Sequence, residues 1–517
     1  MRSKNFSKLA IIHLNKNINI SINCTKYILI GPGTIKNING NRIYLSDLQK
    51  KNSNKLKAEL VYSLQKELRK EKLDSFFEFE ISNLRNDKTK FIDCILNFLL
   101  IREIIKKNEY QTIELITDNK YSINVFNKLK IKNLIVRNFS KKFHENFLFI
   151  PFCKFLIKSF FVVFTLTFFK EKRKFKQNIA LSIFPNFHKD KKENFFNNKD
   201  FLKLNFLLTD ETHLNHTTLD ILKIIYNSKN LNLIHIEQYI KFTHLIICFF
   251  NFLNGYRKIK KKKRSLIIND LDFSIFYDDY LKSSFLNRAK LEIYNGAIKK
   301  FLTIYKPLYF HLYMFEYSFG FYLINQIKKN FKNIKIYGYQ HGIFSDKLLW
   351  LDIIKKSNLI QKYSPTKLYC LNYECLKAYK KKYSFFVSKY SINKKLNLEK
   401  SKNFNLILKK KGNKNIFFSG THDVNELIIY LNNKPKREKK NYFIKLHPKT
   451  KLTNELHELK VLKDTKKINF KNIYLSPTST MVYELLKKKV KFKVFKIDYK
   501  WDILNSNLIK KNNVSII

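Results

Sequence analysis

A histidine follows the apolar, strand-like run at 335–339 and stands between two glycines, in the order Gly338-Tyr339-Gln340-His341-Gly342. Glycines leave the neighbouring backbone open to the close approach of a ligand. A histidine at the carboxyl end of a strand can act as a general base, because its ordinary pKa lies near neutrality. His341 is therefore a candidate catalytic residue, with loop capping as the alternative explanation.

A carboxylate precedes this histidine by one helix. Glu316 lies between a strand-like segment at 308–313 and a helical segment at 317–330. Parallel strands present their carboxyl ends at one edge of a sheet, so Glu316 is expected at the same edge as His341. It could orient the histidine or bind a substrate hydroxyl, and stabilisation of the helix N-terminus is an equally good explanation.

Three successive strand-like runs near the C-terminus end in small polar residues or histidine. These runs are 415–418, 443–446 and 472–475, and the residues that follow or close them are Gly420, Thr421, Lys445, His447, Ser479 and Thr480, with Glu484 on the next helix. Hydroxyls and free amides gathered at helix N-termini favour a phosphate. The three turns together predict an anion pocket.

The elements that must position these residues alternate between strand and helix along most of the chain. Helical spacing at 91–107 and 121–129 alternates with strands at 27–30, 112–116 and 132–136, and a second set starts near 178. This alternation predicts parallel sheets covered on both faces. A polar, basic stretch at 389–402 predicts a linker. The expected domains are 1–395 and 396–517, with room for a sub-boundary near 177.

Several weaker motifs have structural explanations that we prefer. The Gly31-Pro32-Gly33 turn lacks the third glycine of a dinucleotide fingerprint. The acidic groups Asp270-Leu271-Asp272, Asp278-Asp279 and Asp210-Glu211, the last with His213 and His216, are more typical of solvated helix ends than of metal sites. The basic run 258–264 predicts a solvated loop. No metal and no cofactor is expected.

The most apolar segment, 147–169, is followed by a basic run that ends at 176. Lys154 and Lys158 interrupt the segment, so it is too short for a convincing membrane-spanning helix, which needs about 20 apolar residues. An apolar helix that lies in the cytoplasmic leaflet of a membrane, with lysines on anionic headgroups, is one interpretation. A buried core helix is the other.

Composition excludes some classes of protein and indicates the partners and the compartment to expect. The 517 residues include 45% hydrophobic residues, which excludes a wholly disordered chain, and the formal charge is +59. The lysines are spread along the whole length together with abundant Asn, Ile, Phe and Tyr, a bias typical of AT-rich coding sequences. We therefore expect anionic partners but no nucleic acid. Six scattered cysteines without a CxxC motif indicate a reducing, cytoplasmic compartment.

The order of motifs in residues 300–500 resembles that of the GT-B-fold glycosyltransferases that build bacterial surface polysaccharides. The resemblance rests on Gln340-His341-Gly342, Ser364-Pro365-Thr366, Lys445-Leu446-His447-Pro448 and the Ser476–Thr480 stretch followed by Glu484. Sialyltransferases, capsule transferases and CDP-glycerol glycerophosphotransferases are similar in this order. The segment from Glu316 to His341 most resembles a family of surface carbohydrate biosynthesis proteins.

This resemblance implies an α/β, GT-B-like fold, with two Rossmann-like domains that face each other across a cleft. It implies a transferase that moves a sugar or sugar-like group from a nucleotide-activated donor to a glycan or lipid-linked acceptor, at the cytoplasmic face of the inner membrane. His341, with Glu316, would serve the acceptor. The donor phosphates would be bound by Gly420, Thr421, Lys445, His447, Ser479 and Thr480, with Gln340, Gly342 and Glu484 in support.

Two functions of other classes remain open. A non-catalytic scaffold of a polysaccharide assembly complex would use the same residues only to close turns. A basic nucleic-acid-binding protein would account for the charge, but it would need clustered arginines and exposed aromatic residues in a recognised module. Here lysine dominates, and the aromatic residues lie in apolar runs.

Overall fold

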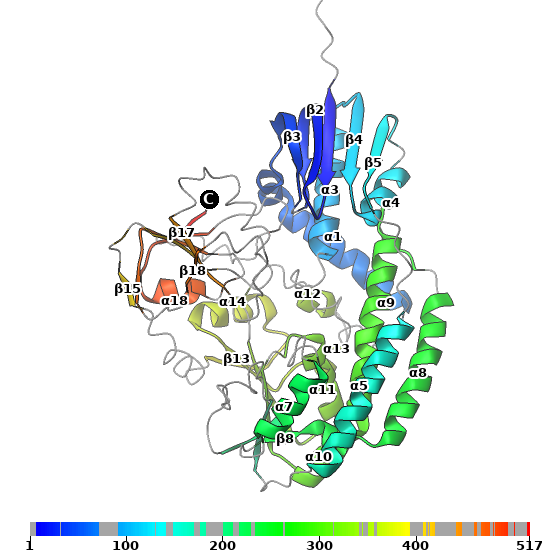
Figure 1. Ribbon diagram of the computed structural model, residues 1–517, viewed down its shortest axis with the longest axis vertical. Helices are drawn as coiled ribbons and strands as arrows, with labels where there is room; N and C mark the ends of the chain where they lie inside the picture. The colour runs from blue at the N-terminus through cyan, green and yellow to red at the C-terminus, as the bar shows by residue number, and fades with distance from the viewer. Residues whose placement is uncertain are drawn as a thin grey trace, which may run out of the picture.

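A computed structural model shows an α/β protein built on parallel sheets, as the alternating pattern predicts (Figure 1). It describes residues 7–31, 33–71, 91–129, 131–140, 148–169, 176–181, 200–209, 217–228, 233–261, 264–313, 315–340, 344, 350–355, 359–392, 407–409, 412, 414–418, 441–446, 460–462, 467–475, 479, 481–494, 501 and 514–516. Within these residues the strands form three larger parallel sheets and two small two-stranded ones.

The first sheet lies at one end of the long axis and has the order β3-β2-β1-β4-β5. Side chains alternate between its two faces, as in any strand. Leu9 and Ile11 of β1 join the core beneath the helices, and Ala10 and Ile12 join a separate cluster with β2 and β3. The elements are β1 (Lys8–His13), β2 (Ile18–Leu29), β3 (Ile35–Arg42), α1 (Leu45–Glu71), α3 (Phe91–Lys107), β4 (Thr112–Thr117), α4 (Lys120–Lys128) and β5 (Leu134–Asn138).

The turn with Gly31 and Gly33 is a place of close backbone approach. A Cβ atom on Gly31 would lie 2.3 Å from the Leu14 carbonyl oxygen, and one on Gly33 would lie 2.3 Å from that of Lys16. The N–H of Gly33 donates to the Leu14 carbonyl oxygen at 2.7 Å. Packing against the chain after β1 therefore accounts for both glycines.

The second sheet has the order β14-β13-β12-β11-β6-β7-β8. From β6 the chain adds strands on one side as far as β8, and it then returns to β11 and adds strands on the other side. This is the Rossmann pattern, and the order reverses between β6 and β11. The strands are β6 (Asn178–Leu181), β7 (Phe201–Asn205), β8 (Leu233–His235), β11 (Tyr309–Tyr313), β12 (Lys335–Tyr339), β13 (Lys367–Cys370) and β14 (Lys389–Ile392).

Helices and short turns surround the second sheet and share one continuous hydrophobic cluster with the helices of the first. They are α5 (Phe149–Phe168), α7 (Thr218–Ser228), η3 (Ile236–Tyr239), α8 (Phe242–Lys261), α9 (Ser274–Leu291), η4 (Glu292–Tyr294), α10 (Asn295–Tyr305), α11 (Ser318–Asn330), α12 (Trp350–Ile354), α13 (Leu359–Tyr363) and α14 (Tyr373–Tyr383). A hairpin of β9 (Ile267–Ile268) and β10 (Leu271–Asp272) precedes α9.

Within the apolar segment 147–169, the residues Phe149–Phe168 form α5. Among the described helices it alone is long and apolar enough to cross a membrane, by length and composition only. One face carries Phe152, Val162 and Leu166 into the hydrophobic cluster. The opposite face leaves Ile157 and Phe168 exposed. The core-helix interpretation therefore describes only the inner face.

The third sheet repeats the Rossmann pattern, with the order β18-β17-β16-β20-β21-β22 and a reversal between β16 and β20. It has a hydrophobic cluster of its own. Its strands are β16 (Asn415–Phe418), β17 (Tyr442–Lys445), β18 (Lys460–Val461), β20 (Asn472–Leu475), β21 (Phe492–Val494) and β22 (Val514–Ile516), with α18 (Met481–Lys487) after β20. A pair of β15 (Ile407–Lys409) and β19 (Lys467–Asn469) lies beside it.

Two predictions about polar segments are wrong over part of their length, at 389–392 and at 258–261. The stretch 389–402 was expected to be a linker, but Lys389–Ile392 forms β14 and pairs with β13. β14 is the edge strand of its sheet, and its side chains are exposed or only half-buried, so a polar sequence suits it. Likewise α8 continues to Lys261, so 258–261 is helical and not a loop. The boundary at 395 lies outside the described residues.

The acidic motif at 270–272 belongs to the hairpin turn. Asn269 and Asp270 have φ values of 49° and 64°, as a two-residue hairpin turn requires. Asp270 pairs with Arg102 at 2.6 Å, and Asp272 pairs with Lys128. Asp278 and Asp279 pair with Arg264 and Lys120. Across the described residues no group of three His, Cys, Asp or Glu could hold a metal ion, and 210–216 lies outside them.

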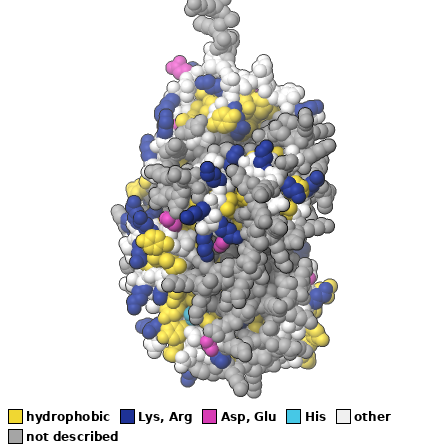
Figure 2. All heavy atoms as spheres, turned by 90° about the vertical axis from the view of Figure 1, so that its left-hand side faces the viewer, with side chains coloured by type: hydrophobic (Ala, Val, Ile, Leu, Met, Phe, Trp, Pro, Cys, Tyr) yellow, Lys and Arg dark blue, Asp and Glu magenta, His cyan; other side chains and the backbone are white. Residues whose placement is uncertain are grey.

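Basic side chains are scattered over the surface seen in Figure 2. On that face lysines and arginines lie between hydrophobic and other polar side chains, with few acidic ones among them. The described side chains in this view do not form the basic stripe that tracks a nucleic-acid backbone.

Candidate functional site

Glu316 lies at the point where the strand order of the second sheet reverses. It follows the end of β11 by three residues, immediately before the Tyr317 cap of α11, and it is 4% exposed. Open α/β sheets bind ligands in the crevice at the carboxyl ends of the two strands that flank such a reversal. The fold thus places this carboxylate at the position where a Rossmann-like sheet takes its ligand.

Gly338 in β12 gives Phe315 room to pack, and Phe315 in turn precedes Glu316. A Cβ atom on Gly338 would lie 3.1 Å from Cγ of Phe315 and 3.0 Å from Cγ of Pro365. Both distances are tighter than almost all real contacts, so a side chain here would displace Phe315 or Pro365. The glycine predicted to open the backbone for a ligand therefore serves packing beside Glu316.

Gln340 ties the ends of β12 and β13 together. Its N–H donates to the Tyr369 carbonyl oxygen at 2.9 Å, and its Oε1 accepts from the Leu371 N–H at 3.1 Å. The side chain is 2% exposed. Gln340 therefore fixes the point from which the loop with His341 departs, and His341 and Gly342 themselves lie outside the described residues.

The groups around Glu316 remain protonated at neutral pH. Burial raises the pKa of Tyr379 well above its usual range, and the Glu316 carboxylate adds to the shift. Burial likewise raises the pKa of the Cys370 thiol, with Cys375 and Glu316 as further causes. A reactive cysteine needs a lowered pKa, so neither Cys370 nor Cys375, whose pKa burial also raises, is a thiolate nucleophile.

The predicted phosphate-binding residues belong to the third sheet. Lys445 is the last residue of β17, and Ser479, 7% exposed, lies between β20 and α18. Ser479 Oγ accepts from the Met481 N–H at 3.4 Å, and Glu484 is in the first turn of α18. The turns after β16 and β20 flank the strand reversal of this sheet. Gly420, Thr421, His447 and Thr480 lie outside the described residues.

Tyr483 on α18 joins the two groups of candidate residues. Its hydroxyl oxygen accepts hydrogen bonds from the Cys375 thiol at 3.0 Å and from the Phe344 N–H at 3.3 Å. Phe344 follows His341 by three residues, and Tyr483 follows Ser479 by four. The fold therefore brings the loop after β12 against the helix after β20. Sequence reasoning missed Tyr483, because one tyrosine on a short helix carries no signal that separates it from a core residue.

Three buried histidines, His13, His235 and His311, have polar partners, and the surroundings of His235 and His311 indicate structural roles. His235 Nε2 lies 2.7 Å from Ser228 Oγ, and its Nδ1 lies 3.2 Å from Asn205 Nδ2. This resembles a nucleophile with its base, but Ser228 donates to the Ile225 carbonyl and is 1% exposed. His311 bonds to Tyr339 at 2.7 Å, and burial lowers its pKa to about 4, so it is neutral at pH 7.

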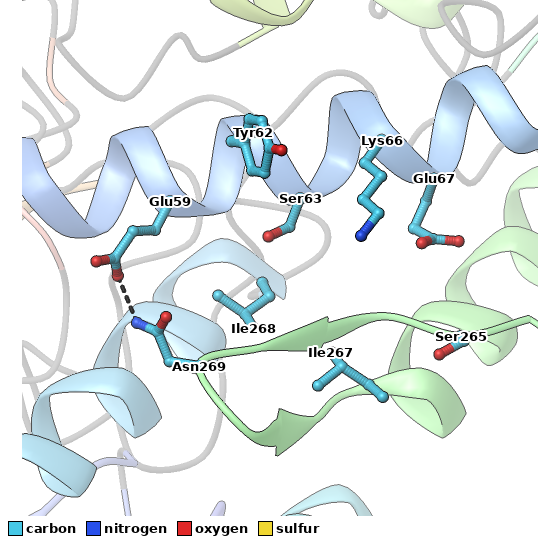
Figure 3. A pocket seen from close by; sticks show the side chains of 9 residues that line it. All are labelled: Glu59, Tyr62, Ser63, Lys66, Glu67, Ser265, Ile267, Ile268 and Asn269. Atoms are coloured by element: carbon cyan, nitrogen blue, oxygen red, sulfur yellow. Dashed lines mark hydrogen bonds between the residues drawn. The ribbon is translucent and has the colours of Figure 1, made fainter.

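A cavity of about 330 Å³ opens elsewhere, between α1 and the β9–β10 hairpin (Figure 3). Asn269 donates to Glu59 across it at 2.6 Å, and charged side chains of α1 face the hairpin. Its lining shares no residue with the candidate site. The lining residues are Glu59, Tyr62, Ser63, Lys66, Glu67, Ser265, Ile267, Ile268 and Asn269.

Glu237, in η3, has a fully buried carboxyl group. Its Oε1 accepts from the Leu207 N–H at 2.6 Å and the Tyr294 hydroxyl at 2.7 Å. Desolvation outweighs these bonds and raises the pKa of Glu237 to about 7. It thus caps the chain after β7, and sequence reasoning did not single it out.

The raised pKa predicts that wild type loses stability relative to Glu237→Gln as pH rises. The folded state retains a proton that the unfolded state, with a pKa near 4.5, has lost. The stabilisation by Glu237 is therefore complete below about pH 4.5 and disappears as pH rises through about 7, a change of up to about 3 kcal/mol. Urea unfolding of both proteins between pH 4.5 and 8 measures it. Parallel pH profiles would contradict the prediction.

Comparison of the chain with protein-family models, curated proteins and solved structures gives no match.

Proposed function

We propose that this protein transfers a sugar or sugar-like group from a nucleotide-activated donor to a glycan or lipid-linked acceptor in surface polysaccharide synthesis. The observation that carries the proposal is that Glu316 and Ser479 follow strands that flank the order reversals of two Rossmann-ordered sheets. The contact of Tyr483 with Phe344 supports a shared cleft between these sheets, as in a GT-B enzyme. The motif order in residues 300–500 supports the same class.

In the proposed reaction the third sheet binds the donor. Lys445, His447, Ser479 and Thr480 hold its phosphates, and the turn with Gly420 and Thr421 offers backbone amides. The acceptor hydroxyl oxygen forms a bond to the donor carbon, and the bond from that carbon to the phosphate oxygen breaks with its electron pair on the nucleotide. Positive charge and N–H groups placed at that oxygen lower the barrier.

The second sheet serves the acceptor. His341 takes the proton that the acceptor hydroxyl loses, and Glu316 orients His341 or binds the hydroxyl itself. Gln340, Gly342 and Glu484 hold the two loops in place. The reaction takes place in the cytoplasm, at the inner face of the membrane, where the donor and a lipid-linked acceptor meet.

Lys445→Ala tests the donor site against a matched lysine of the same sheet. Lys445 ends β17, and Lys471 precedes β20 at the opposite edge. A lost charged hydrogen bond to phosphate is expected to weaken donor binding by about 10- to 100-fold in Lys445→Ala and to leave it unchanged in Lys471→Ala. Thermal-shift titration with CMP-, CDP-, UDP- and GDP-linked donors measures the affinity and identifies the nucleotide.

Donor turnover by histidine variants separates the transferase from its rivals. His341→Ala should lower turnover more than donor affinity, and His447→Ala should do the reverse. Equal donor hydrolysis by wild type and both variants would overturn these roles. If no nucleotide-linked donor raises the melting temperature, a scaffold becomes the better hypothesis. Salt-sensitive heparin retention in that case favours a nucleic-acid-binding protein.

A further inference from the structure

Two neighbouring helices present large apolar side chains to solvent on one face. On α5 these are Ile157, Phe161, Phe164 and Phe168, between 49% and 71% exposed, and their spacing of four, three and four residues aligns them along one side. On α8, Ile246 and Phe250 are each 58% exposed. Contiguous exposed apolar side chains of this size mark interaction surfaces.

The two helices lie side by side and antiparallel (Figure 1). The rings of Phe152 and Phe252 stack with centroids 3.9 Å apart, and those of Phe160 and Phe242 are 5.2 Å apart. From the first ring pair to the second, the residue number increases along α5 and decreases along α8, so the two helices run in opposite directions. The outer sides of α5 and α8 therefore form one surface, which we call the α5–α8 face.

The inner side of the pair is fixed in the core. Phe152, Val162 and Leu166 of α5 and Phe252 of α8 are buried in the cluster that the first two sheets share. A bilayer-spanning α5 would have to leave this core. The α5–α8 face can therefore lie on a hydrophobic layer without a change of fold.

The charges on the two helices have a single sign. Neither α5 nor α8 contains Asp or Glu, and α8 ends in basic residues. Phe149 packs beside Phe249, so the end of α8 projects past the start of α5. Sequence adds a further basic run after α5, at 170–176. The cations within the helices are Lys154, Lys158, Arg257, Lys258, Lys260 and Lys261.

We propose that the α5–α8 face rests on an anionic membrane surface. The phenylalanine and isoleucine side chains enter the boundary between headgroups and acyl chains, and the lysines contact the headgroups. A second copy of the chain would bring the same cations together and meet repulsion, whereas an anionic bilayer complements them. This inference does not depend on the proposed reaction.

Flotation of the purified full-length protein with vesicles tests the proposal. Wild type is expected to float with vesicles of phosphatidylcholine and phosphatidylglycerol, and to bind vesicles of phosphatidylcholine alone far less. Added salt should weaken the binding to the anionic vesicles. Ile157→Ser/Phe161→Ser/Phe164→Ser should bind anionic vesicles at least about tenfold more weakly. Lys258→Glu/Lys261→Glu should lower the affinity for anionic vesicles by about fivefold or more for each lysine replaced, and it should leave binding to phosphatidylcholine vesicles unchanged.

The matched control is Tyr62→Ser/Ile135→Ser, which removes exposed apolar side chains from α1 and β5. It should float as wild type does. Wild type that stays unbound to anionic vesicles would overturn the proposal. So would a dimer that the triple-serine variant dissociates in the absence of lipid, since the face would then be a subunit interface. Resistance of the bound protein to alkaline carbonate extraction would overturn it in favour of a spanning helix.

Discussion

Replacing Glu316 by glutamine is expected to lower the turnover number of the proposed transfer by about 100-fold or more, with little change in donor KM. Glu316 is 4% exposed and stands where the second sheet reverses its strand order. Glutamine keeps the volume of the side chain but removes its charge and its capacity to stabilise a protonated histidine. Steady-state kinetics with the donor identified by thermal shift measures the effect.

Glu292→Gln provides the matched control for this substitution. Glu292, in η4, pairs with Arg288, in α9, at 2.7 Å, and neither residue follows a strand of the second sheet. An i, i+4 pair of this kind, with both side chains half-buried, contributes about 1 kcal/mol or less, so both activity and stability should remain near those of wild type. If Glu316→Gln retains full turnover with an unchanged melting temperature, Glu316 is a helix N-terminal residue and not part of the site.

Truncating Trp501 to alanine is expected to lower the free energy of unfolding by about 3 to 5 kcal/mol. Trp501 is 2% exposed and lies in the cluster that the first two sheets share, although it belongs to the third unit by sequence. Its N–H groups donate to α3: the backbone N–H to Asp93 Oδ1 and the indole N–H to Asn97 Oδ1, each at 3.1 Å. Its removal leaves a cavity and takes away the indole hydrogen bond to Asn97 Oδ1.

Circular dichroism during urea unfolding, together with limited proteolysis, measures this loss. The expected pattern is early release of the third sheet from α3, where Trp501 donates both of its hydrogen bonds, while Tyr483 still contacts Phe344 and Cys375 beside the second sheet. Trp501→Phe keeps most of the buried area and removes only the indole hydrogen bond, so it should cost about 1 kcal/mol. Equal stability of wild type and Trp501→Ala would show that Trp501 does not dock the third unit.

Local sequence patterns were sufficient to predict the bounds of several helices and strands. The helix expected at 91–107 has those bounds in the structure, and the strands expected at 415–418 and 472–475 also match. Each has a clear apolar pattern within one short window. α1 was not predicted, because its buried leucines, Leu56, Leu60 and Leu64, recur only once per turn within a charged sequence. β14 was mistaken for a linker, since an edge strand can be polar.

For the candidate site too, local sequence predicts some features, and only the tertiary structure shows the others. The positions of Glu316 and Ser479 after strands, and of Lys445 at the end of one, follow from local sequence, because the end of an apolar run is visible in the chain itself. That β11 and β20 each flank a reversal of strand order depends on which neighbour each strand pairs with. The contact between Phe344 and Tyr483 joins residues 139 apart, and that between Trp501 and Asp93 joins residues 408 apart. No local pattern specifies such partners.

Sequence by itself determined the α/β class, the strand-end positions of the candidate residues and the basic, apolar character of α5. Tertiary structure alone decided the strand reversals, the Tyr483 contact and the pairing of α5 with α8 into one exposed face. The physical reason is the range of the interactions. Periodicity reflects which face of a single element is buried, whereas the partner that buries it is selected by packing between distant segments, whose free energy is a property of the whole fold.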